Sequence, residues 1–165
     1  MSQYDQLDYN VTEEDVRLVQ RYAMVAMDFA FHENDGSRLN WSDPMTDECT
    51  WDGVTCARFS GINHVRTINW ARRNLTGTVL PEIELLPALE TLDLATNHIE
   101  GPLDPFYSLK FLKNLYLFQN SFSGTIATEV GNLNRLERLY IGYNKLSGTF
   151  PMGLVNPNRD RPLRK

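Results

Sequence analysis

The sequence predicts an α/β repeat solenoid with a parallel sheet on its concave face and a helical, cysteine-bearing cap at its N-terminus. Two observations lead to this prediction. A segment recurs four times at intervals of 23–24 residues, and an amphipathic helical pattern precedes it. With 165 residues the chain is long enough for one domain with a continuous core.

The recurring segment begins at Val65, Leu89, Leu112 and Leu136. Each copy reads apolar-x-x-apolar-x-apolar-x-x-(Asn or Arg)-x-apolar-x-Gly, and its centre alternates apolar and polar residues. That alternation predicts a short half-buried strand. One such strand cannot bury its face alone, so the copies are expected to stack into one parallel sheet over one core. We therefore assign residues 65–155 to about four repeats.

A polar residue follows each strand, where the chain has to turn. It is Arg73 in the first copy and asparagine in the others (Asn97, Asn120 and Asn144). An asparagine side chain both donates to and accepts from backbone groups, so stacked asparagines are expected to satisfy neighbouring turns. Arg73 fits a terminal repeat that contacts a cap. A glycine follows four residues later, where a tight bend is expected (Gly77, Gly101, Gly124 and Gly148).

Residues 12–32 are predicted to form a helix. Thr12 and Asp15 make a capping box at its start. The apolar residues recur at three- and four-residue steps and predict one stripe (Val16, Val19, Ala23, Ala26, Met27 and Ala30). The stripe is expected to cover the first repeat, with a partner-binding helix as the alternative. We assign residues 12–64 to the helix and cap, and expect disordered segments at 1–11 and 156–165.

The repeat pattern resembles the plant-type leucine-rich repeat, L-x-x-L-x-x-L-x-L-x-x-N-x-L-x-G-x-I-P, over roughly residues 41–155. NLTGTVLPEIELL and NSFSGTIATEVGNL match its second half. This resemblance implies a short leucine-rich-repeat horseshoe. The segment GPLDPFYSL is one residue short, and Ala127 replaces the proline of the pattern, so we expect irregular geometry on the convex side.

The segment LNWSDPMTDECTWDGVTC resembles the N-terminal cap of plant-type repeat ectodomains. Its motif is carried by Trp41, Cys49, Trp51, Gly53, Val54 and Cys56. The resemblance implies a Cys49–Cys56 disulfide, provided that the compartment is oxidising. A metal site is the alternative. No second cysteine pair exists, however, and the three histidines lack ligand spacing, so we expect no metal.

Three sequons, at Asn10, Asn40 and Asn74, are candidate glycosylation sites. Together with the cap cysteines they favour an extracellular or cell-surface protein, with a cytoplasmic protein as the alternative. The sequence MSQYDQLDYN shows no secretory signal, so we expect the chain to be a fragment of a longer protein. A membrane anchor would then lie in sequence outside this chain.

Composition and motifs exclude several function classes. The net charge is −5, and residues 1–56 hold twelve acidic against three basic side chains, which disfavours nucleic-acid binding. No nucleotide-binding, hydrolase, metalloprotease or kinase motif occurs. We therefore expect a protein that is not an enzyme and needs no cofactor.

The concave surface is the predicted binding site, because residues flanking the buried leucines align in columns when strands stack. The columns read Thr67, Thr91, Asn114, Arg138; Asn69, Asp93, Tyr116, Tyr140; and Ala71, Ala95, Phe118, Gly142. Tyrosine and arginine are favoured anchors at binding sites. The predicted ligand-binding residues are Asp93, Asn114, Tyr116, Phe118, Arg138, Tyr140 and Tyr143. The alternative is that other structure covers this patch.

Two function classes remain. The first is a binding module of a receptor-like or secreted recognition protein, for a peptide, polysaccharide or protein ligand. The resemblance implies this class, since similar repeats occur in receptor-like kinases with a role in signal transduction and in inhibitors of cell-wall-degrading enzymes. The second is an intracellular leucine-rich-repeat scaffold with reduced cysteines.

Overall fold

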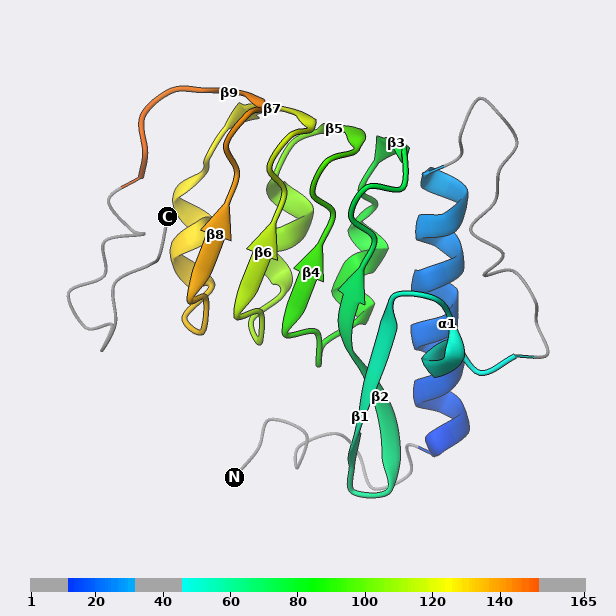
Figure 1. The fold of residues 1–165 in the computed structure, drawn as a ribbon. Helices are drawn as coiled ribbons and strands as arrows, with labels where there is room; N and C mark the ends of the chain where they lie inside the picture. The colour runs from blue at the N-terminus through cyan, green and yellow to red at the C-terminus, as the bar shows by residue number, and fades with distance from the viewer. Residues whose placement is uncertain (1–11, 32–45, 152–165) are drawn as a thin grey trace.

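The computed structural model describes residues 12–31 and 46–151, which form stacked coils with a cap at one end (Figure 1). Trp41, Asn10, Asn40 and the two terminal segments that we expected to be disordered lie outside the described residues. No helix within 12–31 and 46–151 is long and apolar enough to span a membrane. The described elements are α1 (Glu13–Ala30), η2 (Glu48–Thr50), β1 (Val54–Phe59), β2 (Ile62–Asn69), β3 (Thr76–Thr78), η3 (Pro81–Leu85), β4 (Thr91–Asp93), β5 (His98–Gly101), η4 (Asp104–Ser108), β6 (Asn114–Tyr116), β7 (Ser121–Thr125), η5 (Thr128–Asn132), β8 (Arg138–Tyr140) and β9 (Lys145–Ser147).

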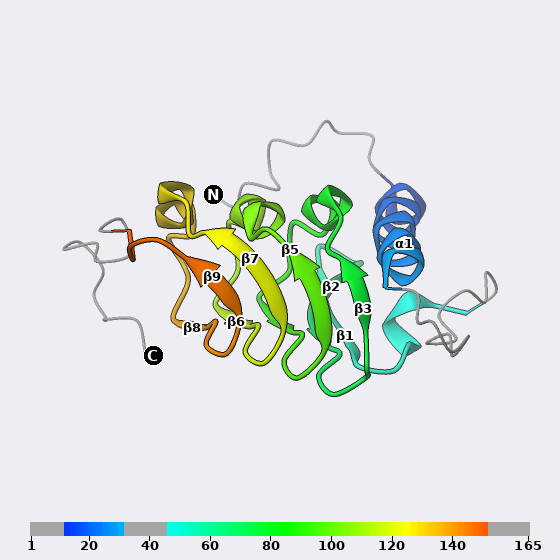
Figure 2. The same ribbon diagram turned by 90° about the horizontal axis from the view of Figure 1, so that it is seen from above.

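The predicted parallel sheet is present, and its strand order is β1-β2-β4-β6-β8. Strands β2, β4, β6 and β8 are parallel, and the buried residues Ile68, Leu92, Leu115 and Leu139 pair in register. A second parallel sheet, β3-β5-β7-β9, was not predicted. The 3-10 helices η3, η4 and η5 lie in a row along one side of the coils (Figure 2).

The convex side is more regular than we expected. The 3-10 helices η3, η4 and η5 each contain five residues, although the second repeat is one residue short. The irregularity is confined to the entry into η4, where Leu103 has ψ −2°. The equivalent residues Leu80 and Ala127 are extended, with ψ of 152° and 158°. The shorter second repeat thus differs from the other two in the backbone conformation at this entry.

The helix α1 begins with the predicted capping box. Thr12 Oγ1 accepts a hydrogen bond from the backbone N–H of Asp15, and the Asp15 carboxylate accepts one from the backbone N–H of Thr12. The bonds from Thr12 hold the pKa of Asp15 below its ordinary value. The end of α1 packs on the first coil, where Phe31 and Trp70 meet edge to face with ring centroids 6.2 Å apart. The predicted covering role of the helix is therefore confirmed.

The predicted apolar stripe of α1 was wrong in its centre. Val19 is 45% exposed, whereas the buried residues are Gln20, Ala23, Met24, Met27 and Asp28. The buried face of α1 is therefore turned about the helix axis relative to the predicted stripe, and Gln20 explains this difference. Its Nε2 donates to Asn63 O at 3.1 Å and its Oε1 accepts from Val65 N at 2.7 Å. This polar side chain therefore docks the helix on the free backbone edge of β2.

Strand β1 forms an antiparallel hairpin with β2, which the sequence analysis did not predict. The connecting residues Ser60 and Gly61 both have positive φ, 49° and 87°. Two such residues match the twist of flanking antiparallel strands. Cys56 lies within β1, and the Cys49–Cys56 disulfide joins that strand to η2 across a Cα–Cα distance of 5.5 Å. The predicted cysteine pair is thus present in the cap.

Candidate binding surface

The predicted asparagine ladder positions the turns beside the concave sheet. Asn97 is 5% exposed, and its Nδ2 donates to Trp70 O and Leu94 O, each at 2.9 Å. Its Oδ1 accepts from the backbone N–H groups of Arg73 and Leu75, each at 3.0 Å. One side chain therefore closes its own turn and the turn of the preceding coil.

The other two asparagines repeat this arrangement. Asn120 donates to Leu94 O and accepts from Ile99 N. Asn144 donates to Leu117 O and accepts from Phe122 N. In the first coil, Arg73 instead forms an ion pair with Asp52 of the cap, with 2.6 Å between Nη2 and Oδ2. The ladder and the cap contact of Arg73 are both as predicted.

Strand register confirms the two main columns of the concave face. Thr91, Asn114 and Arg138 pair in one column, and Asp93, Tyr116 and Tyr140 in the next. The Tyr116 and Tyr140 rings are stacked, with centroids 5.3 Å apart and 25° between their planes. Each tyrosine is half-buried, so the pair is partly accessible to solvent.

A hydrogen-bonded chain of polar side chains lies beside the tyrosines. Arg138 Nη1 donates to Asn114 Oδ1 at 2.9 Å, and Asn114 Nδ2 donates to Thr91 Oγ1 at 2.9 Å. This bond engages one of the five N–H donors of Arg138, so the guanidinium is oriented yet still able to bind an acceptor. The concave sheet thus places an oriented cation next to a stacked aromatic pair.

The remaining predicted residues lie at the margins of this surface. Asp93 Oδ1 accepts from the backbone N–H of Ala95 at 3.0 Å, so it also stabilises its own turn. Phe118 follows β6 and is half-buried. Tyr143 lies in the turn after β8 and is 83% exposed. Whether these seven side chains bind a ligand stays a prediction.

Two features of this face were missed by the sequence analysis. The residue before each ladder position has a left-handed φ of 54–59° (Arg72, Thr96, Gln119 and Tyr143). Thr96 and Gln119 are hydrogen-bonded at 2.9 Å and form a rim next to the aromatic residues. The four left-handed residues could have been found from the sequence, because each one immediately precedes Arg73 or a ladder asparagine.

The second missed feature is a column of alternating charge at the start of the strands. Glu90 forms ion pairs with Arg66 at 2.7 Å and with Lys113 at 2.9 Å, and Glu137 follows in the next coil. Burial alone would raise the pKa of Glu90. The hydrogen bonds and positive charges of Lys113 and Arg66 outweigh burial and lower that pKa below its ordinary value. This charge column borders the concave surface.

Of the three sequons, only Asn74 is described. Asn74 is exposed, while the following Leu75 is 1% exposed and packs in the core. The Asn74 side chain is therefore accessible to a modifying enzyme. Within residues 12–31 and 46–151, no group of three or more histidine, cysteine or carboxylate side chains is arranged to hold a metal ion.

Comparisons with known proteins agree with this architecture. Residues 19–57 match the Leucine rich repeat N-terminal domain, and residues 111–133 and 135–156 match the Leucine Rich Repeat. The Receptor-like kinase TMK4 of Arabidopsis thaliana is 35% identical over 85 residues, which cover 52% of this chain and 9% of the kinase. The chain therefore spans a small part of that relative.

Two solved structures from Arabidopsis thaliana are similar over most of the chain. The ectodomain of the receptor kinase GASSHO1/SCHENGEN3, in complex with CASPARIAN STRIP INTEGRITY FACTOR 2, has a TM-score of 0.77 and 31% identity, covering 83% of this chain and 17% of that one. The BIR3–SERK2 complex gives a TM-score of 0.73 and 26% identity, covering 84% and 76%. With the stacked coils, the asparagine ladder and the disulfide-bearing cap, these matches identify the chain as a plant-type leucine-rich-repeat protein with an N-terminal cap.

Proposed function

We propose that this chain is a non-enzymatic recognition module that binds a polypeptide ligand on its concave surface. The observation that carries the proposal is the stacked Tyr116–Tyr140 pair beside the Arg138–Asn114–Thr91 chain. These groups combine apolar area with oriented hydrogen-bond donors, as binding sites for polypeptides do. The similar ectodomains in complexes with other proteins support the same function.

The test compares a concave double variant with a matched convex one. A ligand captured from extracellular fluid by the immobilised chain is purified and titrated calorimetrically against Tyr116→Ala/Tyr140→Ala and against Glu84→Ala/Glu129→Ala. The concave variant should weaken binding about tenfold or more, because loss of an anchor residue costs about 2 kcal/mol. The convex variant should bind like the unchanged chain. Unchanged affinity of the concave variant rejects the proposal.

We also propose that the chain resides outside the cell or on its surface, as part of a longer receptor-like protein. The cap disulfide and the accessible Asn74 support this location. Intact-mass measurement of protein from its natural source, with and without reductant and deglycosylation, tests it. A shift for one disulfide and loss of glycan are expected. Two free thiols and no glycan would instead establish an intracellular scaffold.

A further inference from the structure

The helix α1 has a second apolar surface, on the side opposite the core. Leu18 and Tyr22 are 60% and 58% exposed, and the neighbouring Val19 is 45% exposed. The core-facing side is already filled by Ala23, Met24 and Met27, which are at most 1% exposed. At about 100° per residue, Leu18 and Tyr22 project away from those residues. A helix that only covered the first coil would not need this second surface.

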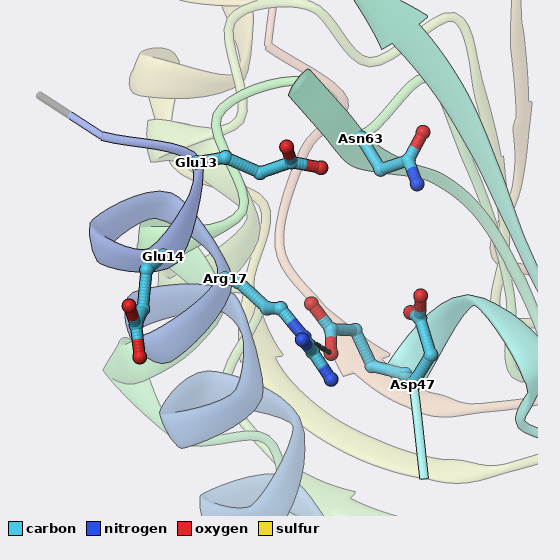
Figure 3. A pocket seen from close by; sticks show the side chains of 6 residues that line it. Glu13, Glu14, Arg17, Asp47 and Asn63 are labelled. Atoms are coloured by element: carbon cyan, nitrogen blue, oxygen red, sulfur yellow. Dashed lines mark ion pairs between the residues drawn. The ribbon is translucent and has the colours of Figure 1, made fainter. Parts of the chain in front are cut away.

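An acidic pocket lies beside the first turns of the same helix. Figure 3 shows Glu13 reaching over the opening toward Asn63, with Asp47 on the opposite wall and Glu14 on the outer side of the helix. The lining residues are Glu13, Glu14, Arg17, Asp47, Glu48 and Asn63. Four carboxylates and one guanidinium line the pocket, and Arg21 adds a second positive charge behind Glu48. Because acidic groups outnumber basic ones, the pocket attracts positive charge.

Glu48 lies at the base of this pocket, and one of its carboxylate oxygens accepts no hydrogen bond. Its side chain is 2% exposed, and Arg21 Nη2 and Arg17 Nε lie 3.5 Å and 3.7 Å from Oε2. No described group donates a hydrogen bond to that oxygen. A buried carboxylate normally accepts several hydrogen bonds, so an additional donor inside the pocket would be stabilising.

The pocket and the apolar surface are continuous. Glu14 lies one helical turn before Leu18, so the two side chains are neighbours on the helix surface. We define the cap surface as Leu18, Val19 and Tyr22 together with Glu13, Glu14 and Asp47. The cap surface thus joins an apolar strip to a negatively charged pocket.

We propose that the cap surface docks a basic, amphipathic segment of a partner polypeptide. Apolar side chains of the segment would pack on Leu18 and Tyr22, and a lysine or arginine would enter the acidic pocket. Charge complementarity selects this occupant. Residues 12–31 and 46–53 hold seven acidic and two basic side chains, which repel anionic lipid and a second copy of the same surface.

The full chain is titrated calorimetrically with two helical probe peptides, one built from leucine and lysine and the other from leucine and glutamate. We expect the lysine peptide to bind and the glutamate peptide not to bind. Glu13→Lys/Glu14→Lys should weaken binding of the lysine peptide about tenfold or more, and Leu18→Ser/Tyr22→Ser should do the same. Thermal melts verify that each variant is folded.

A matched control carries the same charge change on the convex side, Glu84→Lys/Glu129→Lys, and should bind the lysine peptide like the unchanged chain. Equal weakening by this control would show non-specific attraction and overturn the proposal. Absence of binding by the lysine peptide would overturn it too. A dimer that Leu18→Ser/Tyr22→Ser abolishes, or binding to vesicles containing phosphatidylserine, would assign the surface to those occupants instead.

Discussion

The turn that follows the concave strand is stabilised by different side chains in the first coil and in the inner coils. In the inner coils Asn97 or Asn120 hydrogen-bonds the backbone of two successive turns. In the first coil Arg73 takes that position and reaches Asp52 in the cap. An inner coil has a neighbour on each side whose backbone needs satisfying, whereas the first coil meets a cap of different structure. The ladder residue is therefore dictated by what stacks against it.

The largest expected effect follows from replacing the most buried ladder residue. Asn97→Ala removes the side-chain bonds to two backbone N–H groups and to the Trp70 carbonyl, while Leu94 O still accepts from Asn120, and should lower the free energy of unfolding by about 3–4 kcal/mol. The half-buried Asn144 serves fewer backbone groups, so Asn144→Ala should cost about 1–2 kcal/mol. Urea unfolding of both variants measures the difference. Equal losses of unfolding free energy in the two variants would show that an inner coil does not depend on its ladder asparagine more than the last coil does.

The second prediction compares one glycine position in two coils. A Cβ atom on Gly77, in the first coil, would overlap the backbone carbonyl of Ala30 at the end of α1, whereas nothing lies within 4 Å at Gly124 in the third repeat. Both glycines have positive φ, 96° and 84°. Gly77→Ala should therefore cost about 3 kcal/mol and Gly124→Ala about 1 kcal/mol. Similar melting temperatures would show that α1 does not press on the first coil.

The third prediction concerns the cap alone. Cys49→Ser/Cys56→Ser opens a short loop and should lower the free energy of unfolding by about 2 kcal/mol, as expected from the chain entropy of the unfolded state. Amide hydrogen exchange should increase most in β1 and α1, and least in β6 and β8. A uniform increase in hydrogen exchange across all coils would show that the disulfide stabilises the whole chain and not the cap in particular.

The smallest effect on stability is expected from removing the charge of Glu90, and this effect should depend on pH. The pKa of Glu90 is lower in the folded protein than in the unfolded chain, so its ion pairs contribute stability above the unfolded pKa, which is about 4.3. That contribution is lost as the pH falls through the folded pKa. Glu90→Gln should therefore cost below about 1 kcal/mol at pH 7, and this cost should shrink as the pH falls through the folded pKa. Parallel pH–stability curves for the two proteins would contradict this.

The sequence predicted the features that depend on spacing. The intervals of 23–24 residues placed the asparagines and the concave columns correctly, because stacking converts sequence offset directly into contact. The glycines have the positive φ of a tight bend, but in the second sheet Gly77 pairs with Ile99 and Gly101 with Phe122, two residues short of the repeat interval. The cap was predicted less completely. The burial of Gln20 was not predicted, because it depends on hydrogen bonds to the edge of β2 and not on the spacing of apolar residues.

Other elements gave weaker signals. The hairpin of β1 and β2 could have been predicted, since Ser60-Gly61 is a two-residue turn between segments rich in β-forming residues. The second sheet gave almost no signal, because strands such as Thr76–Thr78 and Lys145–Ser147 are short and carry few apolar residues. Ladder asparagines bond the backbone at or just before the strands of this sheet, as Asn97 does at Leu75 and Asn120 at Ile99, and these bonds do not show in the local sequence.

The alternating charge column bears on how such a chain can grow. Arg66, Glu90, Lys113 and Glu137 carry charges of opposite sign in successive coils. Duplication of a single coil within the gene would set two like charges against each other, at a cost of a few tenths of a kcal/mol or more. Duplication of two adjacent coils would preserve the alternation. The column therefore favours expansion of the repeat array in pairs.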